Sequence, residues 1–318
     1  MTTPTALLES NFEHELVLHH GPAELIDLMV PFMRDGADAG DQVVVVGEPT
    51  FVQDLLAAVP DIPDVLAVPE FGRERHPGRD LRKFQQVLST LEGAGPRVRV
   101  VNQMPTMTDH QWHEWRRYEA AANFVLAPYR VWGTCAYDTD RLDARTLEDL
   151  TISHSHVKTS AGRRPSHDFA GLSDHIRSYL DLPPHPIEAT QPLLSLQDPS
   201  AAAARQVIRS VARTFGLTPT ATESAVLAVS ETVTNGSLHG REPVSLRVWA
   251  EDGRITVAVN DMGTGPHPLV GLLPVPVDSG SGRGMWILHQ LLADLHHRTD
   301  RDGYTVRFSV DAPQVAVA

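Results

Sequence analysis

The chain has 318 residues, a formal net charge of −13 and a single cysteine, Cys135. This length predicts about two domains, and the strong negative charge argues against direct nucleic-acid binding, which relies on basic contacts to phosphate. One cysteine excludes an intramolecular disulfide and favours a reducing compartment. Residues 1–13 lack the basic region and apolar run of a signal peptide, and no segment has the apolar length that a membrane helix needs, so we expect a cytoplasmic protein.

The first half of the chain alternates between helical and strand patterns. A helix is expected at 22–39, and the β-branched run Val43–Val46 predicts a strand over 42–47 that is buried on both faces. Further strands are expected at 65–68, 97–101 and 129–136, and further helices at 51–59, 80–92, 108–123 and 143–158. This alternation predicts an α/β domain with a mostly parallel sheet flanked by helices.

The end of the strand at 42–47 lacks the residues of a phosphate-binding P-loop. It continues as Gly47-Glu48-Pro49-Thr50, without the second glycine and the lysine that such a loop requires. Nucleotide hydrolysis at this position is therefore not expected.

Five histidines of the first half fall into two groups. They are His14, His19 and His20 in one group and His154 and His156 in the other. Together with Cys135 they offer the nitrogen and sulfur ligands of a metal site. Because no pair has the spacing of a zinc motif, the pattern favours surface histidines or hydrogen-bonded core histidines over a metal site.

Aromatic residues are densest between residues 112 and 137. They are Trp112, Trp115, Tyr118, Phe124, Tyr129, Trp132 and Tyr137. The pattern favours a core beside a strand over a ligand-lining role, but a small-molecule effector would be sought here first.

The first half resembles a known sensory domain. The motifs are His19, Pro31-Phe32, the strand Val43–Gly47 and the run Cys135-Ala136-Tyr137-Asp138-Thr139. They are similar to the MEDS domain of bacterial regulators, a degenerate RecA-like module. The resemblance implies a MEDS-like sensory domain over residues 10–188.

A linker and a second domain follow. Pro183-Pro184-His185-Pro186 predicts a semi-rigid spacer, and we place the domain boundary near Ala189. The second domain, residues 189–318, is expected to begin with a strand at 193–196. A helix capped by Asp198-Pro199 then runs to about Phe215.

Residues Ser230–Gly240 read as the end of an amphipathic helix. The apolar face is formed by Ala225, Val226, Ala228, Val229, Thr232 and Val233. Glu231, Asn235 and His239 recur every four residues on another face, so that a carboxylate and a carboxamide lie one turn apart. Glu231 could orient or deprotonate a nucleophile, and Asn235 offers a neutral oxygen to Mg²⁺. Taken alone, such a pair is usually just solvated.

A glycine inside this helix, Gly236, costs about 1 kcal/mol relative to alanine. It either allows the close approach of a ligand or lid, or marks a helix that frays early. Gly240 is expected to end the helix.

Two glycine-containing motifs follow the helix. A strand at 255–260 leads into Asp261-Met262-Gly263-Thr264-Gly265, where the chain must turn tightly. Further on, Gly280-Ser281-Gly282-Arg283-Gly284 opens into a helix expected at 285–295, an arrangement that presents backbone N–H groups to phosphate. A final strand is expected at 304–310.

The interval 266–278 is rich in apolar residues. They are Leu269, Val270, Leu272, Leu273, Val275 and Val277. Their number exceeds what a solvated loop needs, which suggests a partner surface or packing over a nucleotide.

The three motifs, in this order, resemble the N, G1 and G2 boxes of the GHKL ATP-binding fold, an α+β sandwich shared by Hsp90-type ATPases, DNA gyrase and histidine kinases. The compactness is most similar to anti-sigma factor serine kinases of the RsbW and SpoIIAB type. The helix expected at 198–215 carries no histidine, so the phosphoacceptor of a sensor histidine kinase is not expected.

The resemblance implies a role for each matching residue. Glu231 would be the catalytic base, Asn235 the Mg²⁺ ligand and Asp261 the acceptor for the adenine amino group. The remaining nucleotide-binding positions would be Gly263 and Gly265 at adenine, Gly280, Gly282 and Gly284 at the phosphates, with His239 and Arg283 nearby.

The function implied is that of a sensor-linked anti-sigma factor. It would bind ATP and Mg²⁺, phosphorylate a serine of an anti-anti-sigma partner of the STAS type, and sequester a sigma factor, as a homodimer. The alternative is a non-catalytic module in which nucleotide or an effector only sets the conformation that holds a protein partner. Retention of Glu231 favours catalysis, because binding alone needs no base.

Overall fold

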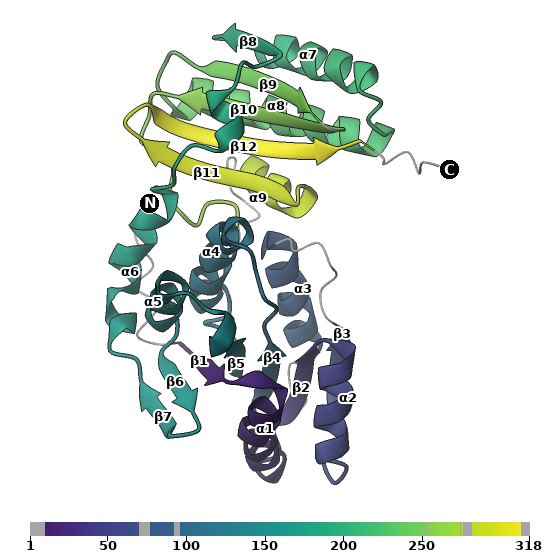
Figure 1. The fold of residues 1–318 in the computed structure, drawn as a ribbon, viewed down its shortest axis with the longest axis vertical. Coiled ribbons are helices and arrows are strands. Elements are labelled where there is room, and N and C mark those ends of the chain that lie inside the picture. The colour runs from purple at the N-terminus through teal and green to yellow at the C-terminus, as the bar shows by residue number, and fades with distance from the viewer. Residues whose placement is uncertain are drawn as a thin grey trace. The chain divides into compact units, whose positions relative to one another are not determined.

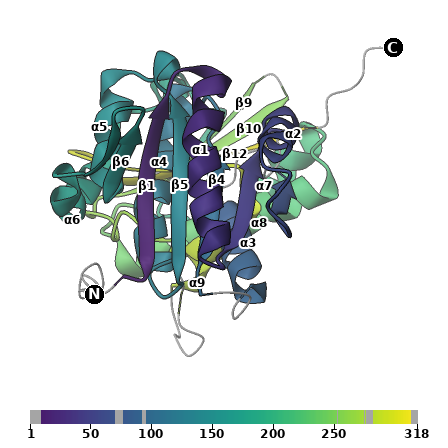
Figure 2. The same ribbon diagram turned by 90° about the horizontal axis from the view of Figure 1, so that it is seen from below.

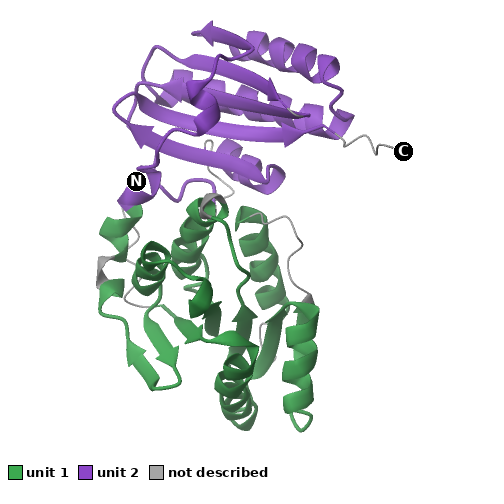
Figure 3. Ribbon diagram, in the orientation of Figure 1, with its two compact units in different colours: residues 1–176 green, residues 177–318 purple. Residues whose placement is uncertain are grey.

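The computed structural model describes residues 10–69, 77–91, 96–251, 253–273, 275 and 282–312. The chain divides into two compact units, residues 1–176 and 177–318 (Figure 3). The boundary expected near Ala189 lies within the second unit. Among the described residues, no helix combines the length and the apolar character needed to span a membrane.

The first unit is built on a largely parallel sheet (Figure 1). Its strands are β1 (Phe12–His19), β2 (Gln42–Gly47), β3 (Leu66–Pro69), β4 (Val98–Gln103), β5 (Val131–Asp138), β6 (His156–Thr159) and β7 (Gly162–Pro165). Within the described residues their order is β3-β2-β4-β5-β1-β6-β7, and only the β6–β7 pair is antiparallel. The predicted α/β fold with a mostly parallel sheet is confirmed.

Helices cover this sheet. They are α1 (Gly21–Asp38), α2 (Pro49–Ala58), α3 (Pro77–Thr90), α4 (Asp109–Val125), α5 (Ala144–Ser153) and α6 (Leu172–His175), with short 3-10 turns at Thr139–Arg141 and Asp168–Gly171. Figure 2 shows α1 running along one face of the sheet. There Met29 and Phe32 pack with Val43, Val45 and other buried residues of β2, β4 and β5, because alternate strand residues point to opposite faces.

Two strands of this sheet differ from the sequence-based expectation. The strand β1 lies in the middle of the sheet, between β5 and β6, although no strand was predicted in its segment. The helix expected at 143–158 ends at Ser153, and its last residues form β6 instead. The β6 strand pairs in parallel with β1 from Glu15 onward, so sheet pairing overrides the local helical pattern.

The second unit is an antiparallel sheet with helices, as predicted. Its strands are β8 (Leu194–Gln197), β9 (Ser245–Glu251), β10 (Arg254–Asp261), β11 (Asp294–Asp300) and β12 (Gly303–Asp311), and its helices are α7 (Ala201–Thr214), α8 (Pro219–His239) and α9 (Arg283–Leu291). Within the described residues the strand order is β11-β12-β10-β9-β8. Ile208, Val229 and Leu288 from the three helices share one core with Leu246 and Val257 of the sheet.

Three local expectations in this unit are corrected. The N-cap of α7 is Ser200, whose Oγ accepts from Ala203 N–H at 3.2 Å, whereas the expected cap, Asp198, instead accepts from Val244 N–H at 2.8 Å. The helix expected at 285–295 already ends at Leu291, because the chain continues as the edge strand β11. The strand β9 was not expected.

The segment before β8 docks on the sheet of its own unit. It contains the 3-10 turns Ile176–Leu180 and Pro186–Ala189. Glu188 Oε2 accepts from Arg247 at 3.1 Å and from Arg298 at 2.9 Å, and Trp249 Nε1 donates to Thr190 O at 3.4 Å. The end of the proposed spacer is therefore fixed to this sheet.

Candidate nucleotide site

The helix α8 carries the predicted base and Mg²⁺ ligand. It begins after Thr218, whose side chain accepts from Ala221 N–H at 3.1 Å, and it ends at Gly240, as predicted. Its buried side includes Val229, Thr232 and Val233. Glu231 and Asn235 are half-buried, and neither side chain forms a hydrogen bond or ion pair with other residues that the structure describes. Both side chains are therefore available to a ligand.

The glycine-rich motif meets Glu231 at the start of α9. A β-carbon on Gly284 would overlap Glu231 Oε2, so a side chain at this position would displace the carboxylate. Gly282, at φ +89°, is the N-cap of α9 and provides no capping side chain. The free N–H groups in the first turn of α9 thus lie next to the Glu231 carboxylate. This arrangement could bind a phosphate group beside a catalytic base.

Asp261 lies where α8 meets the end of β10. It is buried, and its Oδ1 accepts from Gly263 N–H at 2.7 Å and from Arg241 N–H at 3.2 Å. A β-carbon on either Gly240 or Gly263 would collide with this carboxyl group. Both glycines are therefore needed to let the backbone wrap around Asp261, and both hydrogen bonds go to the same oxygen.

Gly236 has a packing role. A β-carbon there would lie 3.3 Å from Val244 Cγ1 and 3.7 Å from Asp261 Cβ. The glycine brings α8 close to the end of the protein's own sheet, and the helix continues to His239, so the alternative of a helix that frays early does not hold.

The other predicted positions surround these residues. Gly265, at φ +74°, lies against the ring of Tyr304, which leaves no room for a side chain. His239, at the end of α8, and Arg283, at the start of α9, are exposed. Gly280 lies outside the described residues. The structure thus brings Glu231 together with Gly284, and Asp261 together with Gly236, Gly240 and Gly263.

The apolar residues after Gly265 are partly internal. Leu269 and Leu272 are buried, and Val270 packs against the core. Gly271, at φ +83°, abuts His289 of α9, so this stretch packs onto that helix. An exposed partner surface is therefore not formed by Leu269 and Leu272. Val277 lies outside the described residues.

Sequence reasoning missed Arg241 and Tyr304. The backbone of Arg241 donates to Asp261 and accepts from Met262 N–H at 2.7 Å, which closes the loop around the carboxylate. Tyr304 pairs with Asp261 across β10 and β12. Both contacts join residues that are far apart in the sequence. Backbone contacts do not depend on residue type, so the sequence gives no sign of them except the glycine at 240.

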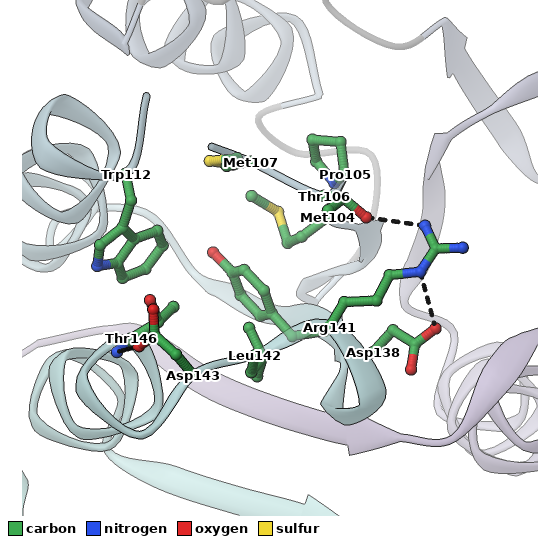
Figure 4. Close-up of a pocket in the computed structure, with 11 residues that line it drawn as sticks. Met104, Pro105, Thr106, Met107, Trp112, Asp138, Arg141, Leu142, Asp143 and Thr146 are labelled. Carbon is green, nitrogen blue, oxygen red and sulfur yellow. Dashed lines mark hydrogen bonds and ion pairs between the residues drawn. The ribbon is translucent and has the colours of Figure 1, made fainter. Parts of the chain in front are cut away.

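The first unit contains a small pocket (Figure 4) of about 130 Å³. Met104–Met107 follow β4, Tyr137 and Asp138 end β5, and Arg141–Asp143 follow it, while Trp112 and Thr146 complete the lining. This position, at the carboxyl ends of parallel strands, is where open α/β sheets usually bind ligands. Figure 4 shows Arg141 between Thr106, to which it donates at 2.8 Å, and Asp138.

The aromatic region forms core, as favoured, and part of it also lines the pocket. Trp112, Trp115, Tyr118 and Tyr137 are buried, as a core role requires. Trp112 and Tyr137 also line the pocket, with their rings edge to face at 6.2 Å.

Comparisons with known proteins agree with this division. Residues 13–155 match the MEDS domain family (MEthanogen/methylotroph, DcmR Sensory domain), and residues 194–310 match the histidine kinase-like ATPase domain family. A comparison with curated proteins found no match.

Among solved structures, the NMR structure of the histidine kinase domain of the E. coli osmosensor EnvZ matches with 18% identity, over 41% of this chain and 94% of that chain. Its TM-score of 0.25 is too low to carry an argument. The two domain matches imply nucleotide binding by the C-terminal unit. The chain carries a MEDS sensory domain followed by a histidine kinase-like ATPase domain.

Proposed function

We propose that the protein is a signalling regulator in which the MEDS domain controls an ATP-dependent serine kinase of the anti-sigma factor type. The contact between Glu231 and the first turn of α9 carries this proposal. This contact puts a carboxylate next to the end of a helix at which phosphate would bind. Nucleotide binding without phosphotransfer would need no base there.

Each residue of the site has a role in this proposal. Asn235 holds Mg²⁺ one turn from Glu231, and Asp261 accepts the adenine amino group through the oxygen that its loop leaves unused. The N–H groups at the start of α9 bind phosphate oxygens. Glu231 takes the proton of a serine hydroxyl as the γ-phosphoryl group is transferred.

The partners in this proposal are a STAS-type anti-anti-sigma protein, which provides the serine, and a sigma factor, which the homodimeric domain sequesters. A small-molecule effector binds the MEDS domain. The pocket beside Trp112 and Tyr137 supports this, because it lies at the carboxyl ends of β4 and β5.

The test is phosphotransfer from γ-labelled ATP to a panel of STAS-type proteins, each compared with its own serine-to-alanine variant. Wild-type protein should label one panel member at serine, and Glu231→Ala should lower the rate about 100-fold or more while ATP still binds. Equal labelling by wild type and Glu231→Ala would remove Glu231 from the mechanism. ATP binding without transfer to any panel member would favour the non-catalytic module, in which nucleotide only sets a partner-binding conformation.

A further inference from the structure

Four buried side chains of the MEDS domain meet at one point. They are His14 of β1, Glu119 of α4, Cys135 of β5 and His154, which follows α5. One ligand atom from each lies within 4.8 Å of all the others. Of the histidines that the sequence singled out, His14 and His154 belong to this cluster, whereas His19, His20 and His156 do not. Glu119 was not expected.

The sheet register places the two strand residues together. In the parallel β1–β5 pair, His14 is opposite Gly133 and Leu16 is opposite Cys135, so His14 and Cys135 point to the same face. The neighbouring Val17 and Ala136 belong to the core on the other face. The helix α4 supplies Glu119 to the same cluster.

Three of the six distances between these ligand atoms fit a tetrahedral metal site. His14 Nε2 lies 3.4 Å from Glu119 Oε2 and 3.4 Å from Cys135 Sγ, and His154 Nε2 lies 3.6 Å from Glu119 Oε2. Zinc bonds of ordinary length in tetrahedral geometry place nitrogen, oxygen and sulfur ligands about 3.4–3.6 Å apart. These three separations therefore match the edges of a zinc tetrahedron.

Both imidazoles direct a lone pair at the centre of the cluster. His154 Nδ1 lies 2.8 Å from Leu150 O, which can only accept, so Nδ1 carries the proton and Nε2 the lone pair. Asn123 Nδ2 donates to Ser153 O at 2.8 Å, which leaves Asn123 Oδ1 to accept from His14 Nδ1 at 3.3 Å. Such outer hydrogen bonds fix metal-binding histidines in the required tautomer.

The carboxylate is held in a similar way. Glu119 Oε1 accepts from Tyr137 Oη at 2.6 Å and from Trp115 Nε1 at 2.9 Å. Glu119 Oε2 and His154 Nε2 are fully buried and have no hydrogen-bond partner. Two unpaired buried acceptors that face each other are costly unless a cation lies between them.

Charge balance also favours a divalent ion. The Glu119 carboxylate and, once a cation is bound, the Cys135 thiolate would each carry one negative charge. Together they would balance the two positive charges of a divalent ion, which leaves a neutral buried site.

We infer that His14, Glu119, Cys135 and His154 form a closed four-coordinate site for a divalent transition-metal ion, namely Zn²⁺. All four ligands come from the protein and all are buried, so the site has no open position for hydrolytic chemistry. The ion ties β1, α4, β5 and the end of α5 together, and its thiolate is the one cysteine of the chain.

The direct test is the metal content of the untagged full chain, purified without chelators and measured by inductively coupled plasma mass spectrometry. We expect about one Zn²⁺ per chain. After removal of the metal, titration with Co²⁺ should give the charge-transfer absorption of a cobalt–thiolate bond and the visible bands of tetrahedral cobalt.

Variants separate the ligands from their surroundings. Cys135→Ser should abolish the charge-transfer absorption, and His154→Asn should lose the bound Zn²⁺. Asn123→Ala, which removes the hydrogen bond to His14 together with the one to Ser153 O, should weaken Zn²⁺ binding about 10- to 100-fold. The matched control is His156→Asn, since His156 is two residues from His154 and hydrogen bonds to Ser155 rather than to the cluster; it should bind as the wild type does.

Measurements on the wild-type protein are enough to overturn the inference, even if the variants do not fold. Less than about a tenth of an equivalent of Zn²⁺, together with no thiolate charge-transfer absorption on Co²⁺ titration, would mean that the cluster is a metal-free polar network. Wild-type affinity for Zn²⁺ in Cys135→Ser, checked for native circular dichroism, would likewise contradict it.

Discussion

The Glu231 carboxylate owes its position to the absence of a side chain at Gly284. Because the two residues come from different helices, α8 and α9, their contact couples the proposed base to the phosphate-binding turn. Asp261 is positioned in a comparable way, by glycines at 240 and 263 that let backbone N–H groups reach its Oδ1. Glycines, which have no side chain, are therefore as important to the geometry of the site as the two carboxylates.

The substitution Gly284→Ala should slow phosphotransfer with little effect on the stability of the fold. Because Glu231 Oε2 is the end of a flexible side chain, Gly284→Ala should lower the free energy of unfolding by less than about 1 kcal/mol. The displaced base should slow single-turnover phosphotransfer about 10- to 100-fold, because a shift of about 1 Å in a reacting group can have that effect.

The double variant Glu231→Ala/Gly284→Ala provides the control. Its rate should equal that of Glu231→Ala, since the methyl group then has nothing left to displace. Additive losses in the double variant would show that Gly284→Ala acts on the phosphates rather than on Glu231.

The packing of helices and strands explains which of them could be predicted from the sequence. The strand β2 is an uninterrupted apolar run and the helix α1 has a clear apolar face, and the structure has both nearly as predicted. For α8 the predicted end at Gly240 is confirmed. The strand β1 was missed because Glu13, His14 and Glu15 give it a polar appearance. Buried Glu15 is satisfied by Arg163 at 2.8 Å and by Trp132 at 3.0 Å, partners that lie far along the chain.

In the candidate sites too, residues in local motifs could be predicted, whereas residues brought together by the fold could not. The boxes around Glu231 and Asp261 could be located from local motifs, because each motif is a helix end or a turn. Glu119 could not, because the fold alone brings α4 to β1 and β5. Its one local signal was an acid placed just before the buried residues Ala120–Ala122.

The close packing of α8 on the sheet gives a prediction at the scale of elements. Gly236→Leu should destabilise the protein by about 1–3 kcal/mol, although leucine favours helices, because Val244 and Asp261 leave no space for the side chain. Ser237→Leu, one residue further along the same helix and exposed, is the matched control and should be neutral or slightly stabilising. Urea denaturation measures both, and equal stabilities for the two variants would show that α8 is not packed as described.

For the whole molecule, the important feature is where the ATPase unit begins. Leu180 belongs to its core, and Glu188 bonds Arg247 and Arg298 of its sheet. A fragment of residues 177–318 should therefore be more stable than one of residues 190–318. We expect a difference of at least about 3 kcal/mol, because a buried leucine and a charge-paired glutamate are both lost.

Thermal and chemical unfolding of the two fragments check this expectation. Glu188→Gln in the longer fragment isolates the ionic part and should account for only a share of the difference. Equal stability of the two fragments would place the true start of the domain after Ala189, where the proline-rich spacer was expected to end.

The central claim is that the boxes around Glu231, Asn235 and Asp261 form a working nucleotide site. Isothermal calorimetry of the full chain with ATP, with and without Mg²⁺, tests it most directly when the wild type is compared with Asn235→Ala. We predict that the wild type binds ATP more tightly with Mg²⁺ and that Asn235→Ala loses this Mg²⁺-dependent gain. No ATP binding by the folded wild type, or an undiminished Mg²⁺ effect in Asn235→Ala, would contradict the account.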